Sequence, residues 1–276
     1  MYSSLRLEKK SNDISLHFSQ VAGHYRDLRT TDPEPIIHIV QELGPILALP
    51  RIDVADIGCG GGRYSLLFAK YLDGKLRLRC VDNNEHMLEA LSTYLNANGV
   101  SRFVSVQSEA ESLPFGDNSF DCLLALNAVH HFKLREFLVE AARILRDRSL
   151  LFIYTRTPEQ NSRNIWGRYF PQFCQKETRL YHQDELERAV SAVPDLKVRS
   201  VKDFKYERVA SLESLIEKAE NRHYSTFWLY SEKEFAAALD EFRQQIRKQF
   251  SDPNRVEWFD ENLLLVIEKE GKAGSV

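Results

Sequence analysis

Apolar residues alternate with polar residues in several short segments of this chain, and they recur at helical spacing between those segments. Ile52 to Ile57 follow this alternation, and Leu76, Leu78 and Cys80 alternate with lysine and arginine. A period of two is typical of a strand, whereas spacings of three and four are typical of a helix. The pattern predicts strands near residues 52–57, 76–82, 102–107, 121–127 and 150–155, with helices at 62–72, 84–98 and 133–146. Such an order indicates an α/β fold, in which a parallel sheet carries helices on both faces.

The second half of the chain shows a different pattern. Residues 157–181 are rich in aromatic side chains and are expected to be irregular; a helix near 183–193 and a strand near 197–204 follow. A last strand is predicted at about 257–268. Residues 205–255 are therefore expected to form a helical insertion between the last two strands. Its two amphipathic patterns are carried by Leu212, Leu215, Ile216 and Ala219, and by Phe235, Leu239, Phe242, Ile246 and Phe250.

The first predicted strand leads into a turn that contains Gly58 and Gly60–Gly62. Glycine permits positive φ and close approach of a ligand to the backbone, and the helix start that follows offers unpaired N–H groups. The dinucleotide fingerprint needs glycine at its sixth position, where Arg63 stands, and no Gly-Lys-Ser/Thr follows as in a Walker loop. Asp56, two residues before the turn, would repel a pyrophosphate but suits a ligand that carries an ammonium group. The turn thus favours an amino-acid-bearing nucleoside, the alternative being a structural turn between a strand and a helix.

A second carboxylate ends the next predicted strand. Asp82 stands 24 positions after Gly58, near the offset at which an acidic residue binds the ribose diol of a nucleotide. It could instead cap the following helix, a role that Asn84 could equally fill. Gly58, Asp82, Glu109 and Asn127 all fall at carboxyl ends of predicted strands, where α/β sheets bind their ligands. The sequence therefore gathers four candidates at one edge of the sheet.

Further motifs follow in a fixed order. They are Asp56-x-Gly-x-Gly-x-Gly62, Val81-Asp82, His86-Met87-Leu88, Glu109-Ala-Glu-Ser-Leu-Pro-Phe115 with Asp117-Asn-Ser-Phe-Asp121, His130-His-Phe132 and Glu140-Ala-Ala-Arg-Ile-Leu145. With these motifs, roughly residues 18–155 resemble the class I S-adenosylmethionine-dependent methyltransferases, closest to the small-molecule branch with its ubiquinone/menaquinone-type and "type 11" enzymes. The resemblance implies S-adenosylmethionine as the cofactor, with S-adenosylhomocysteine as its product. It also implies a Rossmann-like, seven-stranded, mostly parallel sheet whose last strand is antiparallel, with the helical insertion as a lid.

The resemblance also implies roles for the residues around the glycine turn. Asp56 would hold the methionine ammonium group through water. The backbone of Gly58, Cys59 and Gly60 would line the methionine and the ribose, and Asp82 would bind the ribose hydroxyls.

For the remainder of the cofactor, the resemblance points to the later motifs. Asn83 and Met87 would flank the adenosine. Glu109 would accept a hydrogen bond from the adenine amino group, and the Ala110 N–H would donate to a ring nitrogen. Asn127 would lie near the methionine portion.

Two positions depart from the family pattern. Glu109 stands where the family usually has Asp, so that the contact to adenine could be displaced by a methylene. Residues 146–149 stand where the family usually has a Pro-Gly-Gly turn, which weakens the predicted boundary of the fifth strand. Upstream, Tyr25 lies in a segment that in related enzymes folds over the cofactor, which makes it a candidate contact; packing of an amphipathic helix on the sheet edge is the alternative.

Candidate catalytic groups follow the fourth strand. His130 and His131 stand at the correct edge to act as a base, which is needed only if the acceptor must lose a proton. The alternative is that a histidine simply shapes that loop. No third ligand at diagnostic spacing accompanies them, so no metal is expected.

Substrate choice is expected in residues 157–181 and in the insertion. The segment His223 to Tyr230 is unusually aromatic and suggests a pocket for an apolar or planar small molecule; alternatively these rings pack the lid on the sheet. Arg163, Arg168 and Arg222 could pair with an anionic substrate group, or they could be solvated surface residues.

Composition narrows the class of protein. A net charge of −3 argues against a nucleic-acid partner. The polar residues 1–12 show no signal peptide, and no apolar run is long enough to span a membrane. Cys59, Cys80, Cys122 and Cys174 show no CxxC spacing, so reduced thiols in a cytoplasmic protein are expected. Nothing in the pattern indicates an oligomeric state.

Together these observations predict one elaborated domain. Residues 1–156 would hold an N-terminal helical segment and the cofactor-binding core, 157–204 the aromatic-rich segment with a helix and strand six, 205–255 the lid, and 256–276 the closing strand and tail. The expected function is methyl transfer to a small molecule. The alternatives are an RNA- or protein-modifying methyltransferase and a non-catalytic protein that binds S-adenosylmethionine or a similar ligand.

Overall fold

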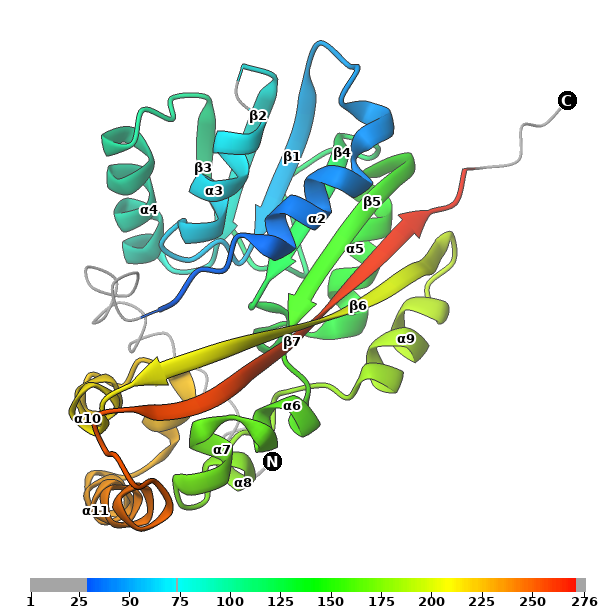
Figure 1. Ribbon diagram of the computed structural model, residues 1–276. Helices are drawn as coiled ribbons and strands as arrows, with labels where there is room; N and C mark the ends of the chain where they lie inside the picture. The colour runs from blue at the N-terminus through cyan, green and yellow to red at the C-terminus, as the bar shows by residue number, and fades with distance from the viewer. Residues whose placement is uncertain (1–28, 73, 272–276) are drawn as a thin grey trace, which may run out of the picture. The chain divides into compact units, whose positions relative to one another are not determined.

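The computed structural model describes residues 29–72 and 74–271. Its centre is a seven-stranded sheet in the order β3-β2-β1-β4-β5-β7-β6 (Figure 1). Strands β1 to β5 pair in parallel, and β7 pairs antiparallel to β5. The strands are β1 Ile52–Ile57, β2 Leu76–Asp82, β3 Phe103–Gln107, β4 Phe120–Leu126, β5 Leu145–Thr155, β6 Leu196–Ala210 and β7 Val256–Lys269. The predicted seven-stranded, mostly parallel α/β sheet is confirmed.

Helices cover both faces of this sheet. They are α2 Glu34–Glu42, α3 Arg63–Tyr71, α4 Glu85–Ala97, α5 Leu134–Ile144 and α9 Gln183–Ser191. The Ser65 hydroxyl of α3 reaches Asp56 of β1, and the Ser92 hydroxyl of α4 lies 2.9 Å from that of Ser105 in β3. Figure 1 shows α2 and α3 on one face and α5 on the other.

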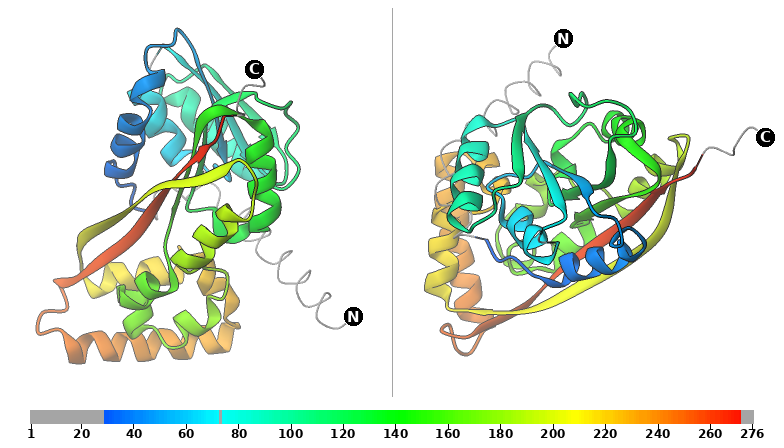
Figure 2. Two further views of the ribbon diagram at one scale, coloured as in Figure 1. Left: turned by 90° about the vertical axis from the view of Figure 1, so that its right-hand side faces the viewer. Right: turned by 90° about the horizontal axis from the view of Figure 1, so that it is seen from above.

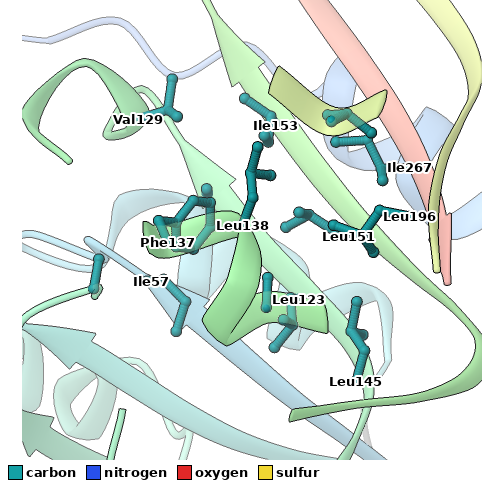
Figure 3. Close-up of a cluster of buried hydrophobic side chains, with 14 of the residues drawn as sticks. Ile57, Leu123, Val129, Phe137, Leu138, Leu145, Leu151, Ile153, Leu196 and Ile267 are labelled. Atoms are coloured by element: carbon teal, nitrogen blue, oxygen red, sulfur yellow. The ribbon is translucent and has the colours of Figure 1, made fainter. Parts of the chain in front are cut away.

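The face beneath α5 and α9 holds a large apolar cluster (Figure 3). Ile57, Leu123 and Leu151 project from three neighbouring strands, and Phe137 and Leu138 of α5 pack on them. These side chains are at most 1% exposed. Burial of each one stabilises the fold by about 1.5–3 kcal/mol. The alternating residues that predicted the strands are thus the residues that hold α5 against the sheet.

The described residues divide into two compact units. The sheet unit comprises residues 31–155, 181–203 and 263–271, and the helical unit comprises residues 29–30, 156–180 and 204–262. Strands β6 and β7 contribute residues to both units. The prediction of one elaborated domain with boundaries at 156, 204 and 255 stays a prediction.

The helical unit is built from short elements around an aromatic core. Trp166 stacks on Phe242 with ring centroids 5.1 Å apart, and Phe170 and Phe227 pack edge-on beside them. Helices α10 and α11 lie side by side (Figure 2). The helices are α6 Pro158–Arg163, α7 Ile165–Tyr169, α8 Phe173–Lys176, α10 Leu212–Glu220 and α11 Glu232–Gln249, with a 3-10 turn, η3, at Ser225–Leu229.

Several local expectations were wrong. Residues 157–181, expected to be irregular, contain α6, α7 and α8, because Thr157 and Asn164 cap the first two helices. Strand β5 begins at Leu145 and not near 150, and β6 runs on to Ala210. Helix α2 was not predicted; Pro35 stands in its first turn, where proline is tolerated. Within the described ranges, no helix is long and apolar enough to cross a membrane.

Candidate functional site

The glycine turn joins β1 to α3 at the carboxyl edge of the sheet. The N–H groups of Gly58 and Cys59 both donate to the carbonyl oxygen of Val81, at 2.8 and 3.0 Å. Gly58 and Gly62 have φ values of +70° and +81°, in the left-handed region. A β-carbon on Gly58 would lie 2.5 Å from the β-carbon of Ala128. The turn therefore needs glycine at this position and is held against the end of β2.

Asp56 lies under this turn and is 2% exposed. The hydroxyl of Ser65 donates to its carboxylate at 2.6 Å. Burial raises the pKa of Asp56 to about 6, the Ser65 hydrogen bond opposes that rise, and the charge of Asp82 adds to it. A cationic group beside Asp56 would restore the ionised form. The environment of Asp56 thus suits an ammonium ligand.

Asp82 ends β2 and accepts hydrogen bonds from two backbone groups. The Gly60 N–H donates to Oδ2 at 2.9 Å, and the Asn84 N–H donates to Oδ1 at 3.0 Å. Burial raises the pKa of Asp82, and these two N–H groups oppose the rise. Asn84 caps α4, because its side chain accepts from the Met87 N–H at 3.1 Å. The capping role considered for Asp82 therefore belongs to Asn84, and the carboxylate of Asp82 keeps lone pairs that a hydroxyl can use.

The residues expected at the adenine lie beyond Asp82. The amide of Asn83 donates to the Glu109 carboxylate at 3.3–3.4 Å, and the Asn83 carbonyl accepts from Gln107 at 3.1 Å. Asn83 and Glu109 are exposed, whereas Met87 and Ala110 are buried. The structure brings Asn83 and Glu109 together at the ends of β2 and β3.

The fourth strand ends at the other side of the turn. Asn127 has φ +56°, and its N–H donates to the Tyr154 carbonyl at 2.7 Å. His130 and His131 lie in a 3-10 turn, η2 Val129–His131, with ring centroids 4.2 Å apart. His130 is partly buried and His131 is exposed. Tyr25 lies outside the described residues. In the ranges that the structure describes, no cluster of three His, Cys, Asp or Glu side chains is arranged to hold a metal ion.

Two features of this edge were not found from the sequence. Ser65 is fully buried within an apolar helical pattern, and only a polar residue on the inner face of α3 hinted at its contact with Asp56. Phe132 limits the space over Gly58, with its Cζ 2.9 Å from the position of a Gly58 β-carbon. Neither contact has a sequence spacing that identifies it.

The arginines considered for an anionic substrate have partners inside the helical unit. Arg163 pairs with Glu261, and Arg222 donates to Glu232 at 2.6 Å and to the Phe227 carbonyl at 2.8 Å. Arg168 lies over the ring of the neighbouring Tyr169.

Comparison with known proteins agrees with the geometry of this edge. The family described as a methyltransferase domain matches residues 55–153, from β1 into β5. Residues 55–153 are thus similar to the S-adenosylmethionine-dependent methyltransferases.

Three relatives illustrate the range of this family. The uncharacterized methyltransferase YcgJ of Bacillus subtilis (strain 168) is 33% identical over 144 residues, or 51% of this chain and 55% of YcgJ. Its crystal structure aligns over 84% of this chain and 99% of its own, with a TM-score of 0.56 and 21% identity, which supports the fold.

The other two relatives have named reactions. The tRNA (carboxymethyluridine(34)-5-O)-methyltransferase ALKBH8 of Mus musculus is 25% identical over 168 residues, or 59% of this chain and 23% of that protein. The ubiquinone/menaquinone biosynthesis C-methyltransferase UbiE of Shewanella sp. (strain W3-18-1) is 30% identical over 128 residues, or 44% of this chain and 50% of UbiE. The chain thus spans about half the length of YcgJ and UbiE and about a quarter of ALKBH8.

Proposed function

We propose that this methyltransferase moves a methyl group from S-adenosylmethionine to a small-molecule acceptor. The observation that carries the proposal is the backbone surface at Gly58–Gly62 with carboxylates Asp56 and Asp82 at the ends of adjacent strands. The ligand has an ammonium group at one end and a ribose diol near its middle, and the two carboxylates match these groups in charge and in hydrogen bonding.

Each candidate residue has a defined task in this proposal. Asp82 accepts from the ribose hydroxyls, and each hydrogen bond to a charged group contributes about 1.5–3 kcal/mol. Asp56 holds the ammonium group, and Asn83 and Glu109 hold the adenine edge. The backbone N–H of Ala110 donates to an adenine nitrogen.

The remaining candidates would line other parts of the cofactor. The backbone of Gly58, Cys59 and Gly60 lines the methionine and the ribose, Met87 packs on the adenosine, and Asn127 lies beside the methionine.

S-adenosylmethionine supplies a methyl group that is already activated by its positively charged sulfur. The protein therefore needs above all to orient the acceptor, and good orientation lowers the activation free energy by about 7–11 kcal/mol. His130 or His131 would take a proton from the acceptor where the reaction requires it. Both histidines come from one short turn directly after β4, so a single loop positions the candidate base.

Two observations support a small molecule as the acceptor. UbiE is named for ubiquinone/menaquinone biosynthesis, and the net charge of −3 does not favour a nucleic-acid partner. All four cysteines are free thiols, which supports a reducing compartment such as the cytoplasm. The second candidate is an RNA-modifying methyltransferase, which the match to ALKBH8 favours.

Calorimetric titration with S-adenosylmethionine and S-adenosylhomocysteine tests the donor site. We expect the wild-type chain to bind both, and Asp82→Ala to bind at least about tenfold more weakly, since a lost charged hydrogen bond exceeds 1.4 kcal/mol. Asp184→Ala is the control, because Asp184 is an exposed residue of α9 paired with Arg188. Absence of binding by the folded wild-type chain would refute the proposal.

A second assay tests the acceptor. Radiolabelled methyl transfer is measured with a metabolite panel, with bulk tRNA and with denatured cell protein. Transfer to metabolites alone supports the small-molecule proposal, whereas transfer to tRNA alone would replace it with the second candidate.

A further inference from the structure

Three arginine side chains converge on Tyr224 and Ser225, just before α11 in the helical unit. The guanidinium of Arg29 lies 4.3 Å from the centre of the Tyr224 ring. Arg156 lies 5.7 Å from the same ring, with Nη1 3.5 Å from the Tyr224 hydroxyl oxygen. Arg179 donates to the Ser225 hydroxyl at 3.0 Å. Three separate parts of the chain therefore deliver a positive charge to two neighbouring residues.

Arg179 has an unused donor. Its Nε donates to Glu177 at 2.8 Å, and its Nη2 contacts the same carboxylate and Ser225. Its Nη1 is buried and has no hydrogen-bond partner among the described residues. A buried charged donor without a partner costs free energy, and an oxygen of a bound anion would satisfy it.

The pair of Glu177 and Arg179 is held rigidly. The side chain of Glu177 is 4% exposed, and the hydroxyl of Thr226 also donates to its carboxylate at 2.5 Å. Burial alone would raise the pKa of Glu177, yet the hydrogen bonds and charge of Arg179 hold that pKa below its ordinary value. Glu177 therefore stays ionised and fixes the plane of the Arg179 guanidinium.

Cationic side chains also lie near the neighbouring His223. The pKa of the buried His223 imidazole is lowered first by burial and then by the charges of Arg29, Lys218 and Arg156, all of them cations. Arg156 is itself paired with Asp260 at 3.2 Å.

We propose that the unused Nη1 donor of Arg179, close to the charges of Arg29 and Arg156, forms an oxyanion subsite of the helical unit that takes a carboxylate or phosphate group. This inference goes beyond the proposed function and does not depend on it. Because Nε and Nη2 of Arg179 already hold Glu177 and Ser225, Nη1 is the donor that remains for a charge-assisted hydrogen bond to an anion. The arginines singled out in the sequence, Arg163, Arg168 and Arg222, have other contacts and are not part of this subsite.

The test uses inorganic phosphate as the probe on the full chain. Phosphate is titrated calorimetrically at constant ionic strength, with and without saturating S-adenosylhomocysteine, which keeps the donor site filled. We expect Glu177→Gln to bind phosphate about tenfold more tightly, because Arg179 loses its competing carboxylate. We expect the double variant Glu177→Gln/Arg179→Gln, whose net charge equals that of the wild type, to bind about tenfold more weakly than the wild type.

Two further variants complete the set. Arg243→Gln removes an arginine that pairs with Asp240 on α11 and should leave phosphate affinity within about twofold of wild type. Arg179→Lys keeps the charge but loses the separate Nη1 donor, and it carries the test if the double variant does not fold. Circular dichroism checks that each variant is folded. Equal phosphate affinity in the wild type, the double variant and Arg179→Lys would overturn the subsite.

Binding of S-adenosylhomocysteine in the same titrations separates the subsite from the proposed function. If S-adenosylhomocysteine does not bind although phosphate does, the proposed function fails and the anion site stands. If S-adenosylhomocysteine binds but phosphate shows no dependence on Arg179, the anion site fails and the proposed function stands.

Discussion

The clearest quantitative prediction concerns Gly58, where the turn passes beneath η2. In Gly58→Ala, the added β-carbon would lie 2.5 Å from the Ala128 β-carbon and 2.9 Å from Cζ of Phe132. Carbon atoms in contact prefer about 3.5–4.0 Å. The left-handed φ costs an alanine about 1–2 kcal/mol, and overpacking of this kind costs about 1–3 kcal/mol. We expect a loss of about 2–5 kcal/mol in the free energy of unfolding.

Gly99→Ala is the matched control. Gly99 also has a left-handed φ, +78°, but no atom lies within 4 Å of its ideal β-carbon. Gly99→Ala should therefore lower the free energy of unfolding only by the cost of the left-handed φ, about 1–2 kcal/mol. Urea unfolding followed by far-ultraviolet circular dichroism measures both variants.

Ligand binding gives the second readout. Relief of the clash must move the N–H groups of Gly58 and Cys59 away from the Val81 carbonyl, so Gly58→Ala should lose most of its affinity for S-adenosylhomocysteine. Gly99→Ala should bind like the wild type. If the two variants lose the same stability and keep the same affinity, the steric argument for the turn is wrong.

Three more predictions follow from buried contacts. The pKa of Asp56, about 6, exceeds that of an unfolded aspartate, so Asp56 makes the free energy of unfolding fall as pH rises from about 4 to 6. The calorimetric affinity for S-adenosylhomocysteine should rise about tenfold per pH unit over the same range, and Asp56→Asn should remove that rise. Ser65→Ala should move the midpoint of the binding profile to higher pH, since it removes a donor to the carboxylate, while Ser92→Ala on α4 should leave it in place. Trp166→Ala should cost about 3–5 kcal/mol in urea unfolding through loss of its packing on Phe242, and a smaller loss than about 1 kcal/mol would contradict the aromatic core.

The sheet could be predicted because its signal is local. Strands β1 and β2 alternate apolar and polar residues, β4 is a largely apolar run, and the helices between them repeat at helical spacing. The ends of the elements depended on other effects. The last residues of strand β6 alternate exposed charged residues with half-buried ones. The strand still extends to Ala210, because it pairs with β7, which lies far along the chain.

The candidate site was predictable where chemistry and strand ends coincide. Asp82 and the glycine turn could be placed at one edge from spacing alone, and the structure joins them through the Gly60 N–H. The contacts of Ser65 and Arg179 could not be predicted, since each depends on the packing of segments distant in sequence. The contacts of Arg163 and Arg222 also depend on packing, so the sequence could not show that these residues are paired with carboxylates.

The insertion between β6 and β7 leaves and re-enters the fold at one place. The Leu212 N–H donates to the Pro253 carbonyl at 2.7 Å, which closes the base of the segment, and the strands on either side are neighbours in the sheet. Such a segment can be lengthened, shortened or exchanged as a cassette without shifting the register of the strands that carry it. The residues of α10, η3 and α11 can therefore change during evolution without any change in the glycine turn. A swap of residues 212–253 between family members is a direct way to ask which of the two parts dictates the product.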